Sequence, residues 1–383
     1  MSVTAPAGFT AGGVTAGLKA SGRPDLALVV NTGPQSTAAG VFTSNRIKAA
    51  PVLWSQQVLA DGALRAVVLN SGGANACTGP DGFADTHRTA ELVADGLGIG
   101  AIDVAVCSTG LIGLRLPMDL LEAGIGQVIA ATSTDGGPDA ATAIMTTDSV
   151  PKEAVVAGEG WSVGGMAKGA GMLAPGLATM LVTLTTDAVL DPTAVHGQLA
   201  EACRTTFDRL DSDGCMSTND SVILMSSGAS GIAPRPEEFV AALTELCADL
   251  AHQLLTDAEG AAHDIAVTVT GAASEGDAVT VGRSIARSNL FKCAVFGADP
   301  NWGRVLAALG TTAAAFKPDQ VDVSFNGVQV CRGGAIGDPR DLVDLSGREV
   351  AVGVDLHAGP HSATIWTNDL TYDYVKENAE YSS

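Results

Sequence analysis

The stretch M-A-K-G-A-G-M-L-A-P-G-L-A-T-M-L-V-T-L-T-T-D, residues 166–187, joins a glycine-rich segment to an apolar one. Three glycines and a proline interrupt its first half, which is therefore predicted to hold no regular element. Residues 179–186 form an almost unbroken apolar and β-branched run, which is typical of a strand buried on both faces. Thr179 stands at the junction, where cleavage at Ala178–Thr179 would leave an N-terminal threonine nucleophile. An ordinary loop-to-strand transition would show the same pattern.

Composition and charge indicate the class of protein and the kinds of partner to expect. The chain has 383 residues, enough for one large domain or two ordinary ones with a sizeable core. It is 46% hydrophobic and 16% charged, which is a globular composition. Its 21 basic and 42 acidic residues give a formal charge of -21, which disfavours nucleic acid and anionic membranes as partners. We therefore expect small-molecule partners.

Cysteine and histidine give no sign of a metal or a disulfide framework. The seven cysteines form no C-x-x-C pair, and we expect most of them to be small core residues. The closest histidines, His357 and His361, are separated by Gly359-Pro360 and cannot share a helical face. No signal peptide or membrane span is recognisable, so we expect a cytoplasmic protein that needs no metal and no cofactor.

Apolar periodicity predicts alternating strands and helices along the whole chain. We expect strands at 26–31, 39–43, 66–70, 103–107, 154–157, 179–186, 221–225 and 265–270, and a meander of short strands from 321 onward. We expect helices at 84–96, from 117, and at 140–145, 192–208 and 236–257. No linker or internal repeat divides the chain. The uneven grouping of elements favours layered α/β architecture with mixed strand pairing over a parallel doubly wound sheet.

Two glycine-rich loops follow predicted strands and carry polar groups suited to catalysis. N-S-G-G-A-N-A occupies residues 70–76, where glycine would let backbone N–H groups face a ligand. S-T-G-L-I-G occupies residues 108–113, at the tip of another strand. Backbone amides and one hydroxyl converging at such a tip form an oxyanion hole, although both segments are also common turn sequences.

Two other motifs are rejected on their context. G-A-G at 169–171 precedes an apolar strand instead of opening a helix, so it does not predict a dinucleotide site. D-S-D-G-C-M-S-T-N-D at 211–220 is rich in oxygen ligands but lacks the spacing and the terminal glutamate of a calcium-binding loop.

Residues 168–188 closely resemble the processing site of the ornithine acetyltransferase (ArgJ) family, also called glutamate N-acetyltransferase. The loops at 70–79, 108–113 and 211–220 also resemble family blocks. Further similar blocks are A-I-M-T-T-D at 143–148, F-G-A-D-P-N-W-G-R at 296–304 and the C-terminal segment 367–383. The resemblance covers nearly the whole chain.

The resemblance implies an αββα sandwich related to N-terminal-nucleophile hydrolases, with a smaller second α/β lobe. It implies self-cleavage into an α chain, 1–178, and a β chain, 179–383, which together form one catalytic unit and a heterotetramer of two α and two β chains. Thr179 would take the acetyl group of N2-acetylornithine and pass it to glutamate in a ping-pong cycle of arginine biosynthesis. Whether acetyl-CoA is a second donor, and whether a paralogous pathway is served, stay open.

The resemblance also implies the roles of individual residues. Thr109 and Gly110 match the oxyanion pair. The positions that match substrate contacts are Thr146, Lys168, Thr179, Glu259, Asn378 and Ser383, with Thr147 an alternative to Thr146. The chemistry agrees, because the α-amine that cleavage creates on Thr179 has a reference pKa of about 7.7–8.0 and can serve as its base.

Ornithine ends in a cation and glutamate in an anion, so one pocket must accept both signs of charge. We hypothesise that Lys168 and Glu259 compensate each other, with Glu259 meeting the ammonium of ornithine and Lys168 a substrate carboxylate. Two other functions stay open at this point. One is an amidase or aminopeptidase of related fold, in which water replaces glutamate, and the other is a binding protein without catalysis.

Overall fold

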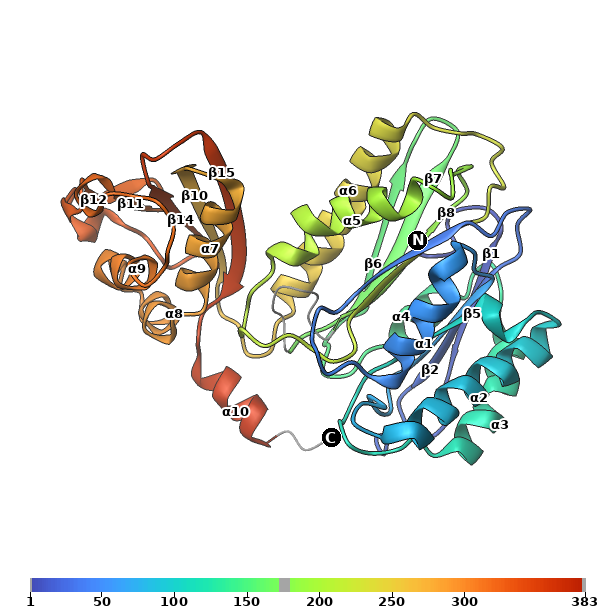
Figure 1. Ribbon diagram of the computed structural model, residues 1–383. Coiled ribbons are helices and arrows are strands. Elements are labelled where there is room, and N and C mark those ends of the chain that lie inside the picture. The colour runs from blue at the N-terminus through green and yellow to red at the C-terminus, as the bar shows by residue number, and fades with distance from the viewer. Residues whose placement is uncertain (1, 172–179, 381–383) are drawn as a thin grey trace. The chain divides into compact units, whose positions relative to one another are not determined.

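The apolar runs form strands in three sheets in a computed structural model, which describes residues 2–171 and 180–380 (Figure 1). The chain divides into two units. Unit 1 comprises residues 1–208 and 215–257, and unit 2 comprises residues 209–214 and 258–382, within the described ranges. No helix among the described residues combines the length and apolar character that spanning a membrane requires.

The first sheet of unit 1 has four strands in the order β1-β2-β4-β5. These strands are β1 (Phe9–Val14), β2 (Leu26–Asn31), β4 (Ala66–Asn70) and β5 (Val104–Ser108). β4 and β5 run parallel, and the other neighbours are antiparallel. Every residue of β2, β4 and β5 is buried, as their continuous apolar runs predict.

The second sheet of unit 1 has five strands in the order β3-β9-β8-β7-β6. These strands are β3 (Ala38–Phe42), β6 (Lys152–Ala157), β7 (Ser162–Lys168), β8 (Leu181–Thr186) and β9 (Ser221–Ser226). Only β8 and β9 pair in parallel. β3 and β6 form the two edges.

Six α-helices among the described residues of unit 1 cover its two sheets. They are α1 (Ala50–Val58), α2 (Gly79–Leu97), α3 (Met118–Ala131), α4 (Gly137–Ala143), α5 (Val195–Thr205) and α6 (Pro236–Thr256). α2 and α3 contact the first sheet, whereas α5 and α6 contact the second (Figure 1). The two sheets share one core, in which Leu28 and Val68 belong to the same cluster as Leu181 and Ile223. Unit 1 is therefore the expected αββα sandwich with mixed pairing.

Unit 2 is a six-stranded sheet in the order β13-β12-β11-β14-β10-β15 with its own core. Its strands are β10 (Asp264–Ala272), β11 (Asp322–Phe325), β12 (Val328–Arg332), β13 (Ala335–Ile336), β14 (Glu349–Asp355) and β15 (His361–Asn368). Its helices are α7 (Glu275–Ala286), α8 (Asn289–Phe296), α9 (Trp302–Leu309) and α10 (Tyr372–Glu380). This unit is the expected second α/β lobe.

The structure corrects several sequence predictions. Residues 166–168 are not irregular, because they end β7 and pair with β8. The predicted meander is wrong beyond β13, since β14 pairs in parallel with β10, and β15 takes the other side of β10. α5 is shorter than predicted at both ends: before it, the carboxylate of Asp191 accepts the N–H of Thr193 in a turn, and after it Phe207–Arg209 form a separate 3-10 turn.

The cysteine prediction is confirmed for the majority of the seven thiols. Those buried are Cys107, Cys203, Cys247 and Cys331, whereas Cys77, Cys215 and Cys293 are exposed. All seven are described and free. Burial raises the pKa of Cys107 to about 12, which makes this thiol a poor nucleophile.

Candidate active site

The loops after β4 and β5 contact each other through glycine. Because the two strands are parallel neighbours in register, Asn70 lies beside Ser108 and both loops start at one edge of the sheet. Gly110 has a φ of +131°, and a Cβ there would lie 2.8 Å from the nitrogen of Gly73. Any side chain at position 110 would therefore collide with the backbone of the neighbouring loop. The glycines of both motifs allow this close approach.

Thr109 and Lys168, two of the predicted site residues, lie beside each other. The side chain of Thr109 is buried at the end of β5, and its N–H donates to the carbonyl of Asn70 at 3.0 Å. Lys168, the last residue of β7, donates from Nζ to Oγ1 of Thr109 at 3.4 Å. Only 2% of Lys168 is exposed, so its charge needs compensation inside the protein.

Asp148 supplies a carboxylate to this cluster, and the sequence analysis missed it. Its Oδ2 lies 4.0 Å from Nζ of Lys168 and accepts the N–H of Thr146 at 2.9 Å. Its Oδ1 accepts the N–H of Gly169 at 2.6 Å. Burial alone would raise the pKa of Asp148, but Lys168 and Lys152 lower it to about 2. Asp148 is therefore ionised at neutral pH and contacts both Lys168 and the backbone of Thr146.

Lys152 joins the cluster to the end of α6. Its side chain is fully buried, and its Nζ lies 2.7 Å from Oδ1 of Asp148 and 2.6 Å from Oδ2 of Asp257. Asp257 also accepts the N–H of Ser149 at 3.0 Å. A lysine buried this completely is tolerated because both of its carboxylate partners lie within hydrogen-bonding distance.

Asn219, from the polar loop at 211–220, contacts both glycine loops. The side-chain amide of Asn219 donates to the carbonyls of Ala74 at 2.6 Å and of Ser108 at 2.8 Å. Next to it, Oδ1 of the buried Asp220 accepts the N–H of Met180 at 3.0 Å. Burial raises the pKa of Asp220 well above its ordinary value. No cluster among the described residues could hold a metal ion.

Glu259 and Asn378 belong to unit 2, where the start of α10 packs on the loop that carries Glu259. Gly260 has a φ of +60°, and a Cβ there would lie 2.2 Å from the nitrogen of Tyr374. Oγ1 of Thr371 donates to the carbonyl of Gly260 at 2.5 Å. Asn378, one helical turn beyond Tyr374, donates to the carbonyl of that residue at 3.0 Å. The proposed pairing of Glu259 with Lys168 stays a prediction.

The remaining predicted positions fall outside the described residues: Ala178, Thr179 and Ser383. Among those described, the structure brings together Thr109, Gly110, Thr146 and Lys168 in unit 1. Thr146 and Thr147 are both half-buried, so the choice between them stays open.

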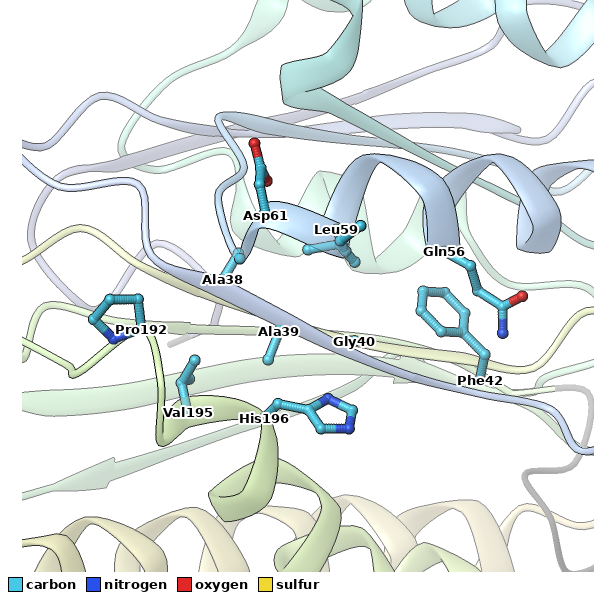
Figure 2. A pocket seen from close by; sticks show the side chains of 12 residues that line it. Ala38, Ala39, Gly40, Phe42, Gln56, Leu59, Asp61, Pro192, Val195 and His196 are labelled. Atoms are coloured by element: carbon cyan, nitrogen blue, oxygen red, sulfur yellow. The ribbon is translucent and has the colours of Figure 1, made fainter.

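A separate pocket of about 450 Å³ lies along the edge strand β3, between α1 and the start of α5 (Figure 2). It is lined by Ala38, Ala39, Gly40, Phe42, Gln56, Leu59, Ala60, Asp61, Gly62, Pro192, Val195 and His196. None of the predicted site residues that the structure describes lines it, so it is distinct from the cluster around Thr109.

The sequence profile of the ArgJ family matches residues 10–383. A relative from Streptomyces avermitilis, "Arginine biosynthesis bifunctional protein ArgJ", is 65% identical over 100% of both chains. A relative of the same name from Mycobacterium tuberculosis is 58% identical over 100% of this chain and 96% of its own.

Two solved structures are also similar. The ornithine acetyltransferase of Mycobacterium tuberculosis, complexed with ornithine, is 66% identical over 45% of this chain and 94% of its own, with a TM-score of 0.45. ArgJ from Bacillus halodurans is 36% identical over 52% of this chain and 97% of its own, with a TM-score of 0.49. The profile match and the full-length identities together show that this chain belongs to the ArgJ family.

Proposed function

We propose that the protein is a self-processing acyltransferase of arginine biosynthesis, which moves the acetyl group of N2-acetylornithine to glutamate through an acetyl-Thr179 intermediate. The observation that carries the proposal is the buried contact of Lys168 with Thr109, at the tip of β5 in a chain of the ArgJ family. Curated relatives at 58–65% identity are named for arginine biosynthesis. The solved relative from Mycobacterium tuberculosis is named an ornithine acetyltransferase and holds ornithine.

The proposed cycle begins with cleavage at Ala178–Thr179. The hydroxyl of Thr179 attacks the carbonyl carbon of Ala178, the peptide C–N bond breaks as the nitrogen takes up the hydroxyl proton, and water hydrolyses the resulting ester. The products are an α chain, 1–178, and a β chain, 179–383. Cleavage also frees an α-amine on Thr179, with a reference pKa of about 7.7–8.0, that can accept the hydroxyl proton in each later turnover.

Two acyl transfers follow. Thr179 Oγ1 attacks the acetyl carbon of N2-acetylornithine, the amide C–N bond breaks, and the leaving α-nitrogen takes the proton held by the amine. The α-nitrogen of glutamate then attacks the acetyl-threonine ester. The C–O bond breaks, Thr179 regains its proton, and N-acetylglutamate leaves. Each attack places negative charge on the acetyl oxygen, which needs donors already in position.

The contacts around Thr109 suit it to be one of those donors. Its Oγ1 accepts from the ammonium of Lys168, so its own hydroxyl proton points elsewhere and is available to an oxyanion. The N–H of the next residue, Gly110, donates to no acceptor among the described residues. A hydroxyl and an adjacent amide supported by a buried cation form a pre-organised oxyanion hole, in which one donor is worth about 2.7–4 kcal/mol.

The word "bifunctional" in the names of the curated relatives favours a second activity in the same site. We propose that acetyl-CoA is a second acetyl donor to Thr179, with glutamate again the acceptor. The chain would then also perform the first acetylation of glutamate. The fragments are expected to stay together as a heterotetramer of two α and two β chains in the cytoplasm.

A panel of donors and acceptors tests the proposal. Purified protein is given N2-acetylornithine or acetyl-CoA as donor, with glutamate or water as acceptor, and the products are separated. We expect acetyl transfer to glutamate to exceed hydrolysis. Predominant hydrolysis would instead indicate an amidase, and no turnover with an uncleaved chain would indicate a binding protein. The variant Thr179→Ala controls for contaminating transferases.

A further inference from the structure

Lys19 lies on a turn between β1 and β2 that one buried carboxylate holds in place. Asp25 is fully buried, and its two oxygens accept the backbone N–H groups of Ala16 and Leu18 at 2.6 Å and of Lys19 at 2.9 Å. Three amide donors on one carboxylate hold the turn in a single conformation. The position of the Lys19 backbone is therefore fixed independently of its own side chain.

This turn packs directly against the glycine loops of the candidate site. A Cβ on Gly72 would lie 2.2 Å from Cβ of Leu18, so the two backbones approach as closely as glycine allows. The N–H of Ser71 donates to the carbonyl of Asp25 at 2.9 Å. Gly73, the residue after Gly72, approaches Gly110. The loop at 70–76 therefore lies between the turn that carries Lys19 and the loop at 108–113.

The side chain of Lys19 reaches from this turn to the segment that carries Thr146. Its Nζ donates to the carbonyl of Met145 at 2.6 Å and to that of Pro24 at 2.9 Å. These two bonds use two of the three ammonium protons, and no acceptor for the third is found among the described residues. Both acceptors are neutral, so neither compensates the charge.

The electrostatic surroundings favour an anion next to this ammonium. Burial, and to a smaller extent the charges of Arg23 and Lys168, lower the pKa of Lys19 to about 8, although Asp25 and Asp148 act in the opposite direction. A lowered pKa means that the surroundings do not fully stabilise the charged ammonium, and a bound carboxylate would stabilise it. Lys168 already has Asp148 at 4.0 Å. A chain with a formal charge of -21 also needs a local cation to hold anionic amino acids.

We propose that Lys19 binds the α-carboxylate of both the acetyl donor and the acceptor, an inference that rests on the proposed transfer between two amino acids. Both substrates carry an α-carboxylate one carbon away from the reacting nitrogen. A cation next to the segment that carries Thr146 can therefore hold that group in both half-reactions, whatever the side chain. Recognition of the side chains is left to other residues.

The test is Lys19→Met, which keeps the apolar length of the side chain and removes the charge. Acetylation by N2-acetylornithine and deacylation by glutamate are measured separately. KM for both amino acids should rise about ten- to a hundredfold, the effect of losing one charge-assisted hydrogen bond, with kcat within about threefold of wild type. Lys317→Met, at an exposed lysine of unit 2, is the matched control.

Deacylation by hydroxylamine, which has no carboxylate, distinguishes carboxylate binding by Lys19 from a structural role of Lys19. Its nitrogen attacks the acetyl-threonine ester, the C–O bond breaks, and acetohydroxamate leaves as Thr179 regains its proton. In Lys19→Met the loss of kcat/KM for glutamate should exceed that for hydroxylamine at least tenfold. Equal losses of kcat/KM for glutamate and hydroxylamine, or KM values that do not change, would overturn this inference. Acetyl transfer by the wild type would still support the proposed function. Absence of transfer in the wild type would overturn both.

Discussion

The substitution Asp148→Asn removes the carboxylate on which the interior of the site depends. Asp148 compensates two buried ammonium groups, those of Lys152 at 2.7 Å and Lys168 at 4.0 Å. It also accepts the backbone N–H groups of Thr146 and Gly169. Asparagine has nearly the same shape but carries no charge, and its amide group would face a donor where the carboxylate accepted one.

The pKa of Asp148 indicates the size of the effect. Its ordinary value of 3.8 falls to about 2, and at about 1.4 kcal/mol for each pH unit the difference of 1.8 corresponds to about 2.5 kcal/mol at pH 7. Leaving buried ammonium groups under-compensated typically costs about 3–5 kcal/mol. We therefore expect Asp148→Asn to lose about 3 kcal/mol of unfolding free energy at pH 7.

The sign of the pH dependence follows from the lowered pKa. Ionised Asp148 stabilises the folded state above about pH 4, and this stabilisation is lost as the pH falls through about 2. Urea denaturation of wild type and Asp148→Asn at pH 7, and then at decreasing pH, should show a difference that shrinks toward pH 2. Asp135→Asn, at an exposed turn, is the control. A loss below about 1 kcal/mol at pH 7, or one that does not depend on pH, would refute the reasoning.

Three further predictions concern turnover. Thr109→Ala should lower kcat about ten- to a thousandfold in steady-state assays and leave KM for N2-acetylornithine nearly unchanged, because the hydroxyl stabilises the oxyanion. A raised KM with a normal kcat would instead make Thr109 a binding residue. Glu259→Gln should impair acetylation by N2-acetylornithine more than deacylation by glutamate when the two steps are timed separately. Equal losses in both steps would show that Glu259 does not recognise the charge of the substrate side chain. Deleting the last six residues, which include Asn378 and Ser383, should reduce turnover far more than an N-terminal tag does, and equal activities would remove both residues from the site.

Strands buried on both faces could be predicted from the sequence, but strands that use glycine for packing could not. β2 and β4 are continuous apolar runs, whereas β1 and β7 each contain two adjacent glycines. A Cβ on Gly165 of β7 would lie 2.8 Å from the side chain of Leu184 and 2.9 Å from that of Leu250. Gly165 thus allows the close packing of α6 on β7, and Gly13 of β1 allows the close approach of Asp139 in α4. A local sequence pattern treats glycines of this kind as strand breaks.

The position of the two glycine loops could be predicted because strand ends are local features, but the buried charges next to them could not. Asp148 and Lys152 look like an ordinary solvated pair at spacing four, and only the tertiary fold buries both. Asn219 reaches a carbonyl 111 residues away, at Ser108. The resemblance named Lys168, yet its neighbour Asp148 becomes visible only once β7 is placed beside the loop after α4.

Intact-mass measurement of the protein with N2-acetylornithine alone tests the central claim most directly. Wild type should appear as two fragments, 1–178 and 179–383, with one acetyl group added to the second at Thr179. Addition of glutamate should remove that group and yield N-acetylglutamate, while Thr179→Ala should remain a single, unmodified chain. A fully active wild-type chain that stays whole, or an acetyl group that never appears on Thr179, would contradict the account.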